Sequence, residues 1–170
     1  VDILEKVEIG GVEQWIMANG KSNDLPVLLW VHGGPGAAQM AGGRYYNGSL
    51  EDEFIVVHWD QRGAGKSNSE NFDENTLNVN QFLSDVEDMT EYLKERFGKE
   101  KIFLLGHSWG SYIGILSVSK NPENYHGYIG VSQVVLLKDQ QILAYEELLK
   151  RIEGDIGEGR KNRNLEILSN

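Results

Sequence analysis

The residues most able to do chemistry in this chain lie in one short stretch around Ser108. An apolar run at residues 102–105 ends at Gly106, Ser108 follows two positions later, and Gly110 lies two positions beyond it. This Gly-x-Ser-x-Gly spacing, between a strand-like run and a helix-like segment, is typical of a nucleophile elbow, a tight turn that presents a serine hydroxyl. Side chains at the two flanking positions would collide in such a turn, which favours glycine at both. Ser108 is therefore the candidate nucleophile.

An ordinary strand that ends in a glycine turn would have a similar sequence, and bare matches to this pattern arise by chance. The context favours the elbow, because residues 109–120 have the composition of a helix and follow the serine directly. The first N–H groups and the dipole of a helix favour negative charge. This position of Ser108 therefore predicts chemistry in which an anion develops beside its hydroxyl.

A glycine-rich loop ends the apolar run at residues 26–32, and its sequence is His32-Gly33-Gly34-Pro35-Gly36. Acyl transfer requires two N–H donors directed at a developing oxyanion. We expect one donor from Trp109, directly after the candidate nucleophile, and the other from Gly33 or Gly34, with a slight preference for Gly33. Pro35 has no N–H and would stiffen the loop, whereas His32 would hold it by hydrogen bonds. Without the elbow, the loop would be interpreted as an ordinary Gly-Pro turn.

A third stretch ends in Gly65-Lys66-Ser67, the residues that close a phosphate-binding P-loop. The full motif requires a glycine five positions before Gly65, and that position is Asp60. We therefore interpret the stretch as a structural turn, in which Asp60 and Arg62 would pair and brace the loops around the site. Binding of a magnesium nucleotide is the disfavoured alternative.

Four histidines are candidates for the base that a serine nucleophile needs, and none is well placed. The side chain of His107, inside the elbow, should point away from Ser108. His32 belongs to the glycine-rich loop, and His58 lies in a buried run. His126 precedes a strand, at the edge of the sheet opposite Ser108. None of the four is therefore a good catalytic base, although a serine hydroxyl is a poor nucleophile without one.

Apolar runs alternate with helix-like segments along the chain, and this alternation predicts a mostly parallel sheet with flanking helices and right-handed crossovers. In such sheets ligands bind beyond the carboxyl ends of the strands, where Ser108 and the loops after two other strands would meet. Residues 1–17 predict an N-terminal hairpin that turns at Gly10-Gly11. The expected buried strands are at residues 26–32, 54–59, 102–105 and 128–131, and the expected core helices are at 82–97 and 109–120.

The net charge of the chain limits the classes of partner that it is expected to bind. A formal net charge of −10 over 170 residues argues against nucleic acid or an anionic membrane. The chain has no cysteine, so it has neither a disulfide framework nor a thiolate metal site, and this suits a cytoplasmic location. We expect no metal and no cofactor. The sequence does not predict the oligomeric state.

Together the three motifs, at residues 32–36, 59–67 and 106–111, resemble those of the proline iminopeptidase (prolyl aminopeptidase) branch of the α/β-hydrolases, over most of residues 5–135. The resemblance implies an α/β-hydrolase fold, Ser108 as nucleophile, and an oxyanion hole formed by Trp109 and a glycine of residues 33–36. It also implies the release of an N-terminal residue, often proline, from a short peptide. Amino-acid amides and esters are alternative substrates, and a non-catalytic protein that binds a small ligand is the alternative class.

The resemblance further implies a helical cap after about residue 133. We therefore divide the chain into residues 1–133, the N-terminal part of the hydrolase core, and residues 134–170, the start of the cap or lid. Residues 153–164 are polar and broken by glycine, which predicts a loop or a mobile segment of the lid. In the family the triad acid and histidine lie beyond the cap, so we expect them outside this chain, together with the last strands of the sheet. The 170-residue chain alone is then expected to be inactive or nearly so.

Overall fold

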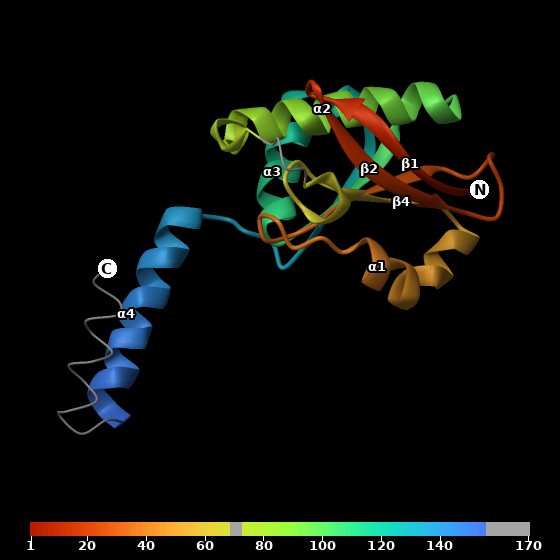
Figure 1. Cartoon of the computed structure of the whole chain (residues 1–170). Coiled ribbons are helices and arrows are strands. Elements are labelled where there is room, and N and C mark those ends of the chain that lie inside the picture. Colours follow the sequence, from red (N-terminus) through yellow and green to blue (C-terminus); the bar gives the residue numbers. More distant parts are fainter. Residues whose placement is uncertain (69–72, 156–170) are drawn as a thin grey trace. The chain divides into compact units, whose positions relative to one another are not determined.

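The computed structural model describes residues 1–68 and 73–155, and its six strands form one mixed sheet in the order β1-β2-β4-β3-β5-β6 (Figure 1). Antiparallel pairs join β1 to β2 and β2 to β4, whereas β4, β3, β5 and β6 are parallel to one another. The predicted parallel sheet with an N-terminal hairpin is confirmed. The strands are β1 (Asp2–Ile9), β2 (Val12–Asn19), β3 (Val27–Val31), β4 (Ile55–Asp60), β5 (Ile102–His107) and β6 (Tyr125–Val131).

Local sequence explains the turn of the hairpin and the burial of the central strands. Gly10 and Gly11 have φ angles of 56° and 75°, the positive pair that a tight hairpin turn requires. Every side chain of β4 is buried, as expected for a strand that is covered on both faces. Val31 pairs with Gly106 in the parallel register of β3 and β5. The loops that follow these two strands therefore begin side by side.

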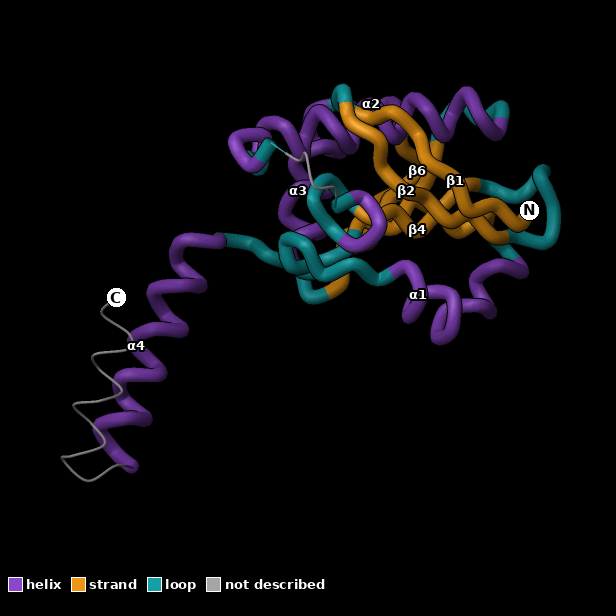
Figure 2. Tube along the Cα trace, in the orientation of Figure 1, coloured by secondary structure: helices purple, strands orange, loops and turns teal. Residues whose placement is uncertain are grey.

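Helices cover both faces of the sheet, and Figure 2 shows α2 (Val79–Phe97) and α1 (Met40–Asn47) on opposite sides. The Asn78 side chain caps the start of α2 by accepting the N–H of Gln81 at 3.0 Å, and Gly98 ends the helix with a φ of 61°. α3 (Trp109–Lys120) packs against both α2 and β5. The hydrophobic side chains that α2 contributes to the core are Phe82, Val86, Met89 and Leu93. Short 3-10 turns lie at Gly48–Asp52, Gly65–Ser67, Glu74–Thr76 and Pro122–Asn124.

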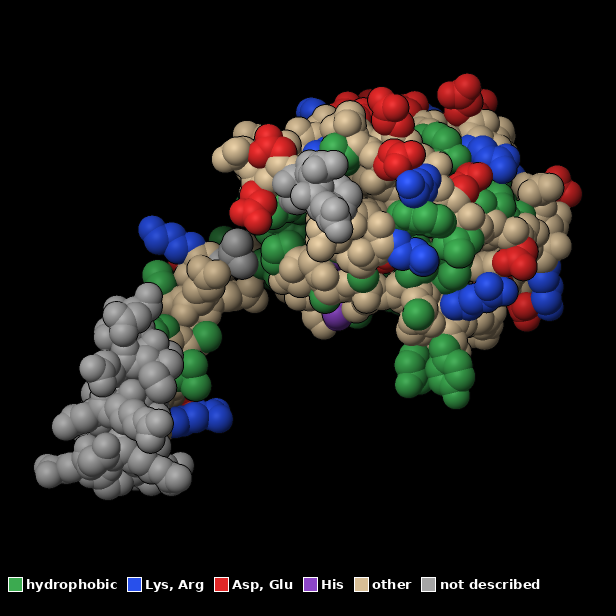
Figure 3. All heavy atoms as spheres, in the orientation of Figure 1, with side chains coloured by type: hydrophobic (Ala, Val, Ile, Leu, Met, Phe, Trp, Pro, Cys, Tyr) green, Lys and Arg blue, Asp and Glu red, His purple; other side chains and the backbone are tan. Residues whose placement is uncertain are grey.

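Sequence analysis did not predict α1 and placed the start of β6 three residues too late. Only Met40 and Gly43 of α1 are buried, so its hydrophobic pattern is weak. Hydrophobic side chains protrude at this helix (Figure 3), where Tyr45 and Tyr46 are 81 % and 80 % exposed. β6 begins with residues that are partly polar or small, and its apolar pattern appears only from Tyr128 onward.

The chain divides into two compact units, Val1–Val134 and Val135–Asn170. The second unit contains α4 (Leu137–Asp155), whose apolar side chains Ile142, Leu143, Tyr145 and Leu148 are 46–64 % exposed. The loop predicted at 153–164 is wrong at its start, because the helix continues through residue 155; one glycine costs a helix only about 1 kcal/mol. Residues 156–164 lie outside the described residues. The assignment of this unit to a cap stays a prediction.

Candidate active site

Ser108 occupies the sharp connection between β5 and α3, with φ 52° and ψ −116°. Residues other than glycine rarely adopt a positive φ, and those that do cost about 1–3 kcal/mol and cluster at functional sites. Two glycines allow the turn to be this tight. A Cβ on Gly106 would collide with the carbonyl oxygen of Gly110, and a Cβ on Gly110 would collide with that of Val31. The backbone therefore has the strand–turn–helix geometry of an elbow.

Main-chain hydrogen bonds hold the elbow on both sides. The N–H of Ser108 donates to the carbonyl of Val131 at 2.9 Å, and its own carbonyl accepts from the N–H and the hydroxyl of Ser111 at 2.8 and 2.6 Å. Among the described residues, neither the Ser108 hydroxyl nor the main-chain N–H of Trp109 has a hydrogen-bond partner. The fold thus fixes the backbone at Ser108 and leaves these two groups unengaged there.

The glycine-rich loop after β3 lies directly against the elbow. A Cβ placed on Gly33 would be 3.2 Å from the Cβ of Ser108 and 3.1 Å from Nδ1 of His107. Gly34 and Gly36 have φ angles of 120° and 91°, which favour glycine. The structure therefore brings Gly33 and Ser108, which are far apart in sequence, into contact distance. Whether these residues carry the predicted chemistry stays a prediction.

His32, only 1 % exposed, ties this loop to the end of β4. Its Nε2 accepts the main-chain N–H of Gln61 at 3.1 Å, so the ring proton lies on Nδ1, which donates to the carbonyl of Gly33 at 2.8 Å. The N–H of Ala37 donates to the same carbonyl at 3.3 Å. Burial lowers the pKa of His32 below 6.5, so the imidazole is neutral near pH 7. A neutral ring can donate and accept at once, as this arrangement requires.

The predicted pairing of Asp60 with Arg62 is wrong. Arg62 instead forms a buried two-point ion pair with Asp85 on the core face of α2, with both N–O distances at 2.8 Å, and it also donates to the carbonyl of Gly10 at 2.9 Å. Asp60 accepts the main-chain N–H of Lys66 at 2.9 Å. The two side chains diverge because the Asp85 carboxylate of α2 is buried and requires a cationic partner, which Arg62 supplies.

The Gly65-Lys66-Ser67 stretch forms a 3-10 turn that is folded onto the protein itself. The Ser67 hydroxyl donates to the carbonyl of Asp60 and accepts the N–H of Trp15 at 2.8 Å. The N–H of Ser67 donates to the carbonyl of Ala64 at 2.8 Å. A phosphate cradle needs free N–H groups, and the N–H groups of Lys66 and Ser67 are both engaged within the protein, which supports the interpretation as a structural turn.

No histidine in the described part of the chain forms a hydrogen bond with the Ser108 hydroxyl. Nδ1 of His107 instead forms a hydrogen bond with the side-chain nitrogen Nε2 of Gln39, at 3.3 Å. His58 is buried in β4, and burial lowers its pKa to about 4. His126 lies near the start of β6, at the end of the strand remote from Ser108. Residues 1–68 and 73–155 also contain no cluster of three metal-ligating side chains, and no helix there is long and apolar enough to cross a membrane.

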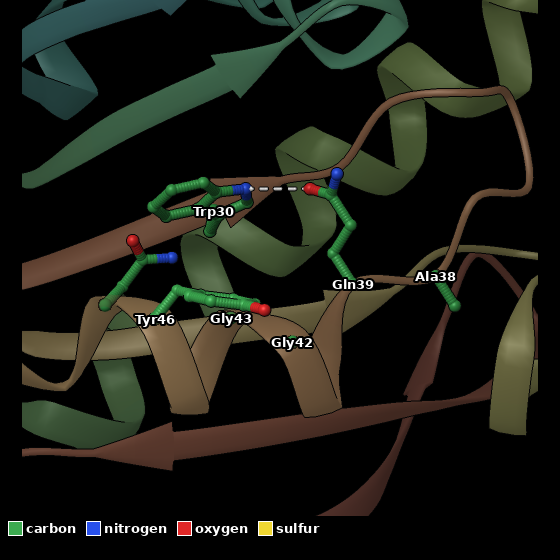
Figure 4. A pocket seen from close by; sticks show the side chains of 7 residues that line it. Trp30, Ala38, Gln39, Gly42, Gly43 and Tyr46 are labelled. Atoms are coloured by element: carbon green, nitrogen blue, oxygen red, sulfur yellow. Dashed lines mark hydrogen bonds between the residues drawn. The ribbon is translucent and has the colours of Figure 1, made fainter.

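Two of the pockets in the described part of the chain lie near the glycine-rich loop after β3 and near α1. One of about 340 Å³ is bordered by Pro35, Gly36 and Trp109 together with residues of the α2 start. The other, of about 300 Å³, lies beside α1 (Figure 4), where the indole N–H of Trp30 donates to the Gln39 side chain at 3.2 Å. Sequence analysis missed Gln39 and Gln61, because an isolated glutamine carries no chemical signature. Only the spatial neighbourhood of His32 and His107 identifies them.

Comparison with known proteins places these features in a family context. Residues 14–165 match the family described as serine aminopeptidase, S33. The "probable aminopeptidase YbaC" of Bacillus subtilis is 37 % identical over 169 residues, which cover 99 % of this chain and 52 % of that protein. The proline iminopeptidase of Neisseria meningitidis serogroup B is 30 % identical over 158 residues, covering 87 % of this chain and 48 % of that protein. The chain spans about half the length of these curated relatives.

Solved structures show the same fold. The proline iminopeptidase-related protein of Thermus thermophilus superposes with a TM-score of 0.64 at 28 % identity, covering 76 % of this chain and 44 % of that one. Epoxide hydrolase A of Mycobacterium thermoresistibile superposes with a TM-score of 0.63 at 24 % identity, covering 76 % and 39 %. The second similarity concerns the fold alone.

Proposed function

The chain belongs to the serine aminopeptidase S33 family and has the α/β-hydrolase fold, and we propose that it carries the nucleophile and oxyanion donors of a proline iminopeptidase. The single observation that carries this proposal is the backbone at Ser108, with φ 52°, directly against Gly33. The substrate would be a short peptide or an amino-acid derivative with a free N-terminus. A cytoplasmic location is part of the same proposal.

In this mechanism the Ser108 hydroxyl attacks the carbonyl carbon of the N-terminal residue, while a histidine from beyond the described residues takes the proton. The negative charge that develops on the carbonyl oxygen is held by the N–H of Trp109 and by a glycine N–H of the loop. The histidine then protonates the leaving amine, which departs and leaves an acyl-enzyme on Ser108. Water hydrolyses that ester and releases the amino acid.

Peptide geometry indicates how the loop would supply its donor. The C=O and N–H of a trans peptide point in opposite directions. The carbonyl of Gly33 is held by His32 and Ala37, so the N–H of Gly34, in the same peptide, is directed away from them. The N–H of Gly33 likewise shares a peptide with the carbonyl of His32, which accepts from Gln61 at 2.9 Å. Both glycines therefore remain candidates, each with a fixed direction.

A serine-reactive fluorophosphonate probe tests this proposal on the full-length gene product. Labelling should be lost in Ser108→Ala and retained in Ser119→Ala, a matched variant at an exposed position of α3. Hydrolysis of proline p-nitroanilide, compared with alanine p-nitroanilide and a proline ester, then tests the finer substrate assignment. Undiminished labelling of Ser108→Ala would contradict the proposal.

A non-catalytic ligand-binding protein is the second candidate. The observation in its favour is that no described histidine contacts the Ser108 hydroxyl, and an unassisted serine is a poor nucleophile. If the full-length wild-type product shows neither labelling nor hydrolysis of any of these substrates, this candidate replaces the enzyme.

A further inference from the structure

Gln61 donates two hydrogen bonds to the glycine-rich loop, and both are accepted by His32. Its side-chain amide donates to the carbonyl of His32 at 2.9 Å, and its main-chain N–H donates to Nε2 of the same residue at 3.1 Å. Gln61 is 1 % exposed, so water does not compete for these bonds. The two contacts act on two different peptides of the loop.

The first contact acts on the N–H of Gly33. This group shares a peptide with the carbonyl of His32, so an anchor on that oxygen fixes the direction of the N–H. The second contact acts on the N–H of Gly34. Donation into Nε2 leaves the ring proton on Nδ1, which then holds the carbonyl of Gly33, the peptide partner of that N–H. Gln61 thus bears on the direction of both candidate donors.

The support beneath Gln61 is rigid. The next residue, Arg62, forms its ion pair with Asp85, and both side chains are at most 1 % exposed. The guanidinium also bonds to the carbonyl of Gly10 in the hairpin turn. A side chain that starts from such an anchored backbone can hold its partner within the narrow tolerance that catalysis demands.

We propose that Gln61 is a positioning residue, which sets the directions of the loop N–H donors that stabilise the oxyanion without itself touching substrate. This inference rests on the proposed function, because the donors matter only if a charge develops at Ser108. A residue that merely fills space would affect folding stability and leave transition-state stabilisation in the folded enzyme unchanged. The two roles therefore predict different kinetics.

The test compares Gln61→Met with Gln14→Met in the full-length gene product. Met has a similar shape but lacks the amide donor. Gln14 is a matched control: it is 0 % exposed and bonds to Asp85 at 3.0 Å and to Trp59 at 2.9 Å, with no bond to the loop. For Gln61→Met we expect kcat to fall about 10- to 100-fold with KM within about twofold. Affinity for a boronic acid analogue of the transition state should fall by the same factor.

Gln14→Met should lose stability while its kcat stays within about twofold of the wild type. If Gln61→Met does not fold, Gln61→Asn takes its place; its amide is one methylene too short to reach His32, so kcat and boronate affinity should again fall together. Unchanged kcat in the folded Gln61 variant, with Ser108→Ala inactive, would overturn this inference and leave the proposed function intact. Full activity in Ser108→Ala would overturn both.

Discussion

Two glycine-rich turns follow neighbouring parallel strands of this sheet, and they differ in what their N–H groups do. In the turn after β3, the N–H groups of Gly33 and Gly34 have no acceptor among the described residues. In the turn after β4, the N–H of Lys66 donates to the Asp60 carboxylate, and that of Ser67 donates to a main-chain carbonyl. The second turn thus contains a carboxylate that accepts one of its own N–H groups, whereas the first turn leaves two N–H groups available for an external anion.

Glycine content alone therefore does not make an anion site. What distinguishes the first turn is that its carbonyls are anchored, by His32 and Gln61, on the side opposite its N–H groups. The sequence of the second turn is more similar to a phosphate-binding motif, yet the Asp60 carboxylate already accepts the N–H of Lys66 there. The availability of N–H groups is therefore the property to test.

The largest loss of stability is expected when the buried ion pair between Arg62 and Asp85 is broken. Arg62→Met removes the partner of a fully buried carboxylate, so the free energy of unfolding should fall by about 3–5 kcal/mol in urea denaturation. The double variant Arg62→Met with Asp85→Leu should recover much of this loss, because no uncompensated charge remains. A loss below about 1 kcal/mol in the single variant would show that the pair does not hold this region.

The next largest effect concerns the pH dependence of stability, for which the two buried histidines, His32 and His58, differ. His32 has partners on both ring nitrogens, whereas Nδ1 of His58 has none among the described residues. Burial lowers the pKa of His58 from 6.5 to about 4, so the unfolded chain binds the proton more readily. The contribution of neutral His58 to the free energy of unfolding is fully present above pH 6.5. It is lost as the pH falls toward 4, by roughly 3 kcal/mol in total.

Urea denaturation at pH 7 and pH 4.5 measures this effect. His58→Gln should lose less stability between the two pH values than the wild type, whereas Ser119→Ala, at an exposed position without a titratable group, should behave like the wild type. Because His32 titrates in all three proteins, its contribution cancels. Equal pH dependence in the wild type and His58→Gln would contradict the assignment of a depressed pKa to His58.

The smallest effect concerns the hydroxyl that closes the second turn. Ser67→Ala leaves the N–H of Trp15 without its acceptor, which should cost about 1–3 kcal/mol of unfolding free energy. Magnesium ATP should not change the melting temperature of either the wild type or the variant, because the N–H groups of Lys66 and Ser67 are already engaged within the protein. Stabilisation of the wild type by the nucleotide, lost in Ser67→Ala, would reverse our comparison of the two turns.

Much of the fold could be predicted from the sequence, because apolar runs and helical periodicity mark elements with a buried face. The parallel strands and α2 are examples, and the Gly-x-Ser-x-Gly spacing located the bend at Ser108. α1 escaped prediction because it buries only two residues. A weakly amphipathic helix depends on what the rest of the fold leaves uncovered, and local sequence does not contain that information.

Partner choice inside the core was the part that could not be predicted. Arg62 pairs with a residue 23 positions away rather than with Asp60, because the packing of α2 decides which carboxylate faces it. Gln61 likewise gains its importance from contact with His32, 29 positions earlier. Long-range hydrogen bonds of this kind follow from tertiary packing and leave no periodic pattern.

In the proposed enzyme, the N–H groups of the first turn and of Trp109 converge on an anion at Ser108. A crystal structure of the full-length gene product after reaction with a fluorophosphonate tests it most directly. Our account predicts a phosphorus–oxygen bond at Ser108, with the phosphoryl oxygen about 2.7–3.1 Å from the N–H nitrogen of Trp109 and from that of Gly33 or Gly34. A phosphoryl oxygen directed into solvent, or an adduct on another residue, would contradict it.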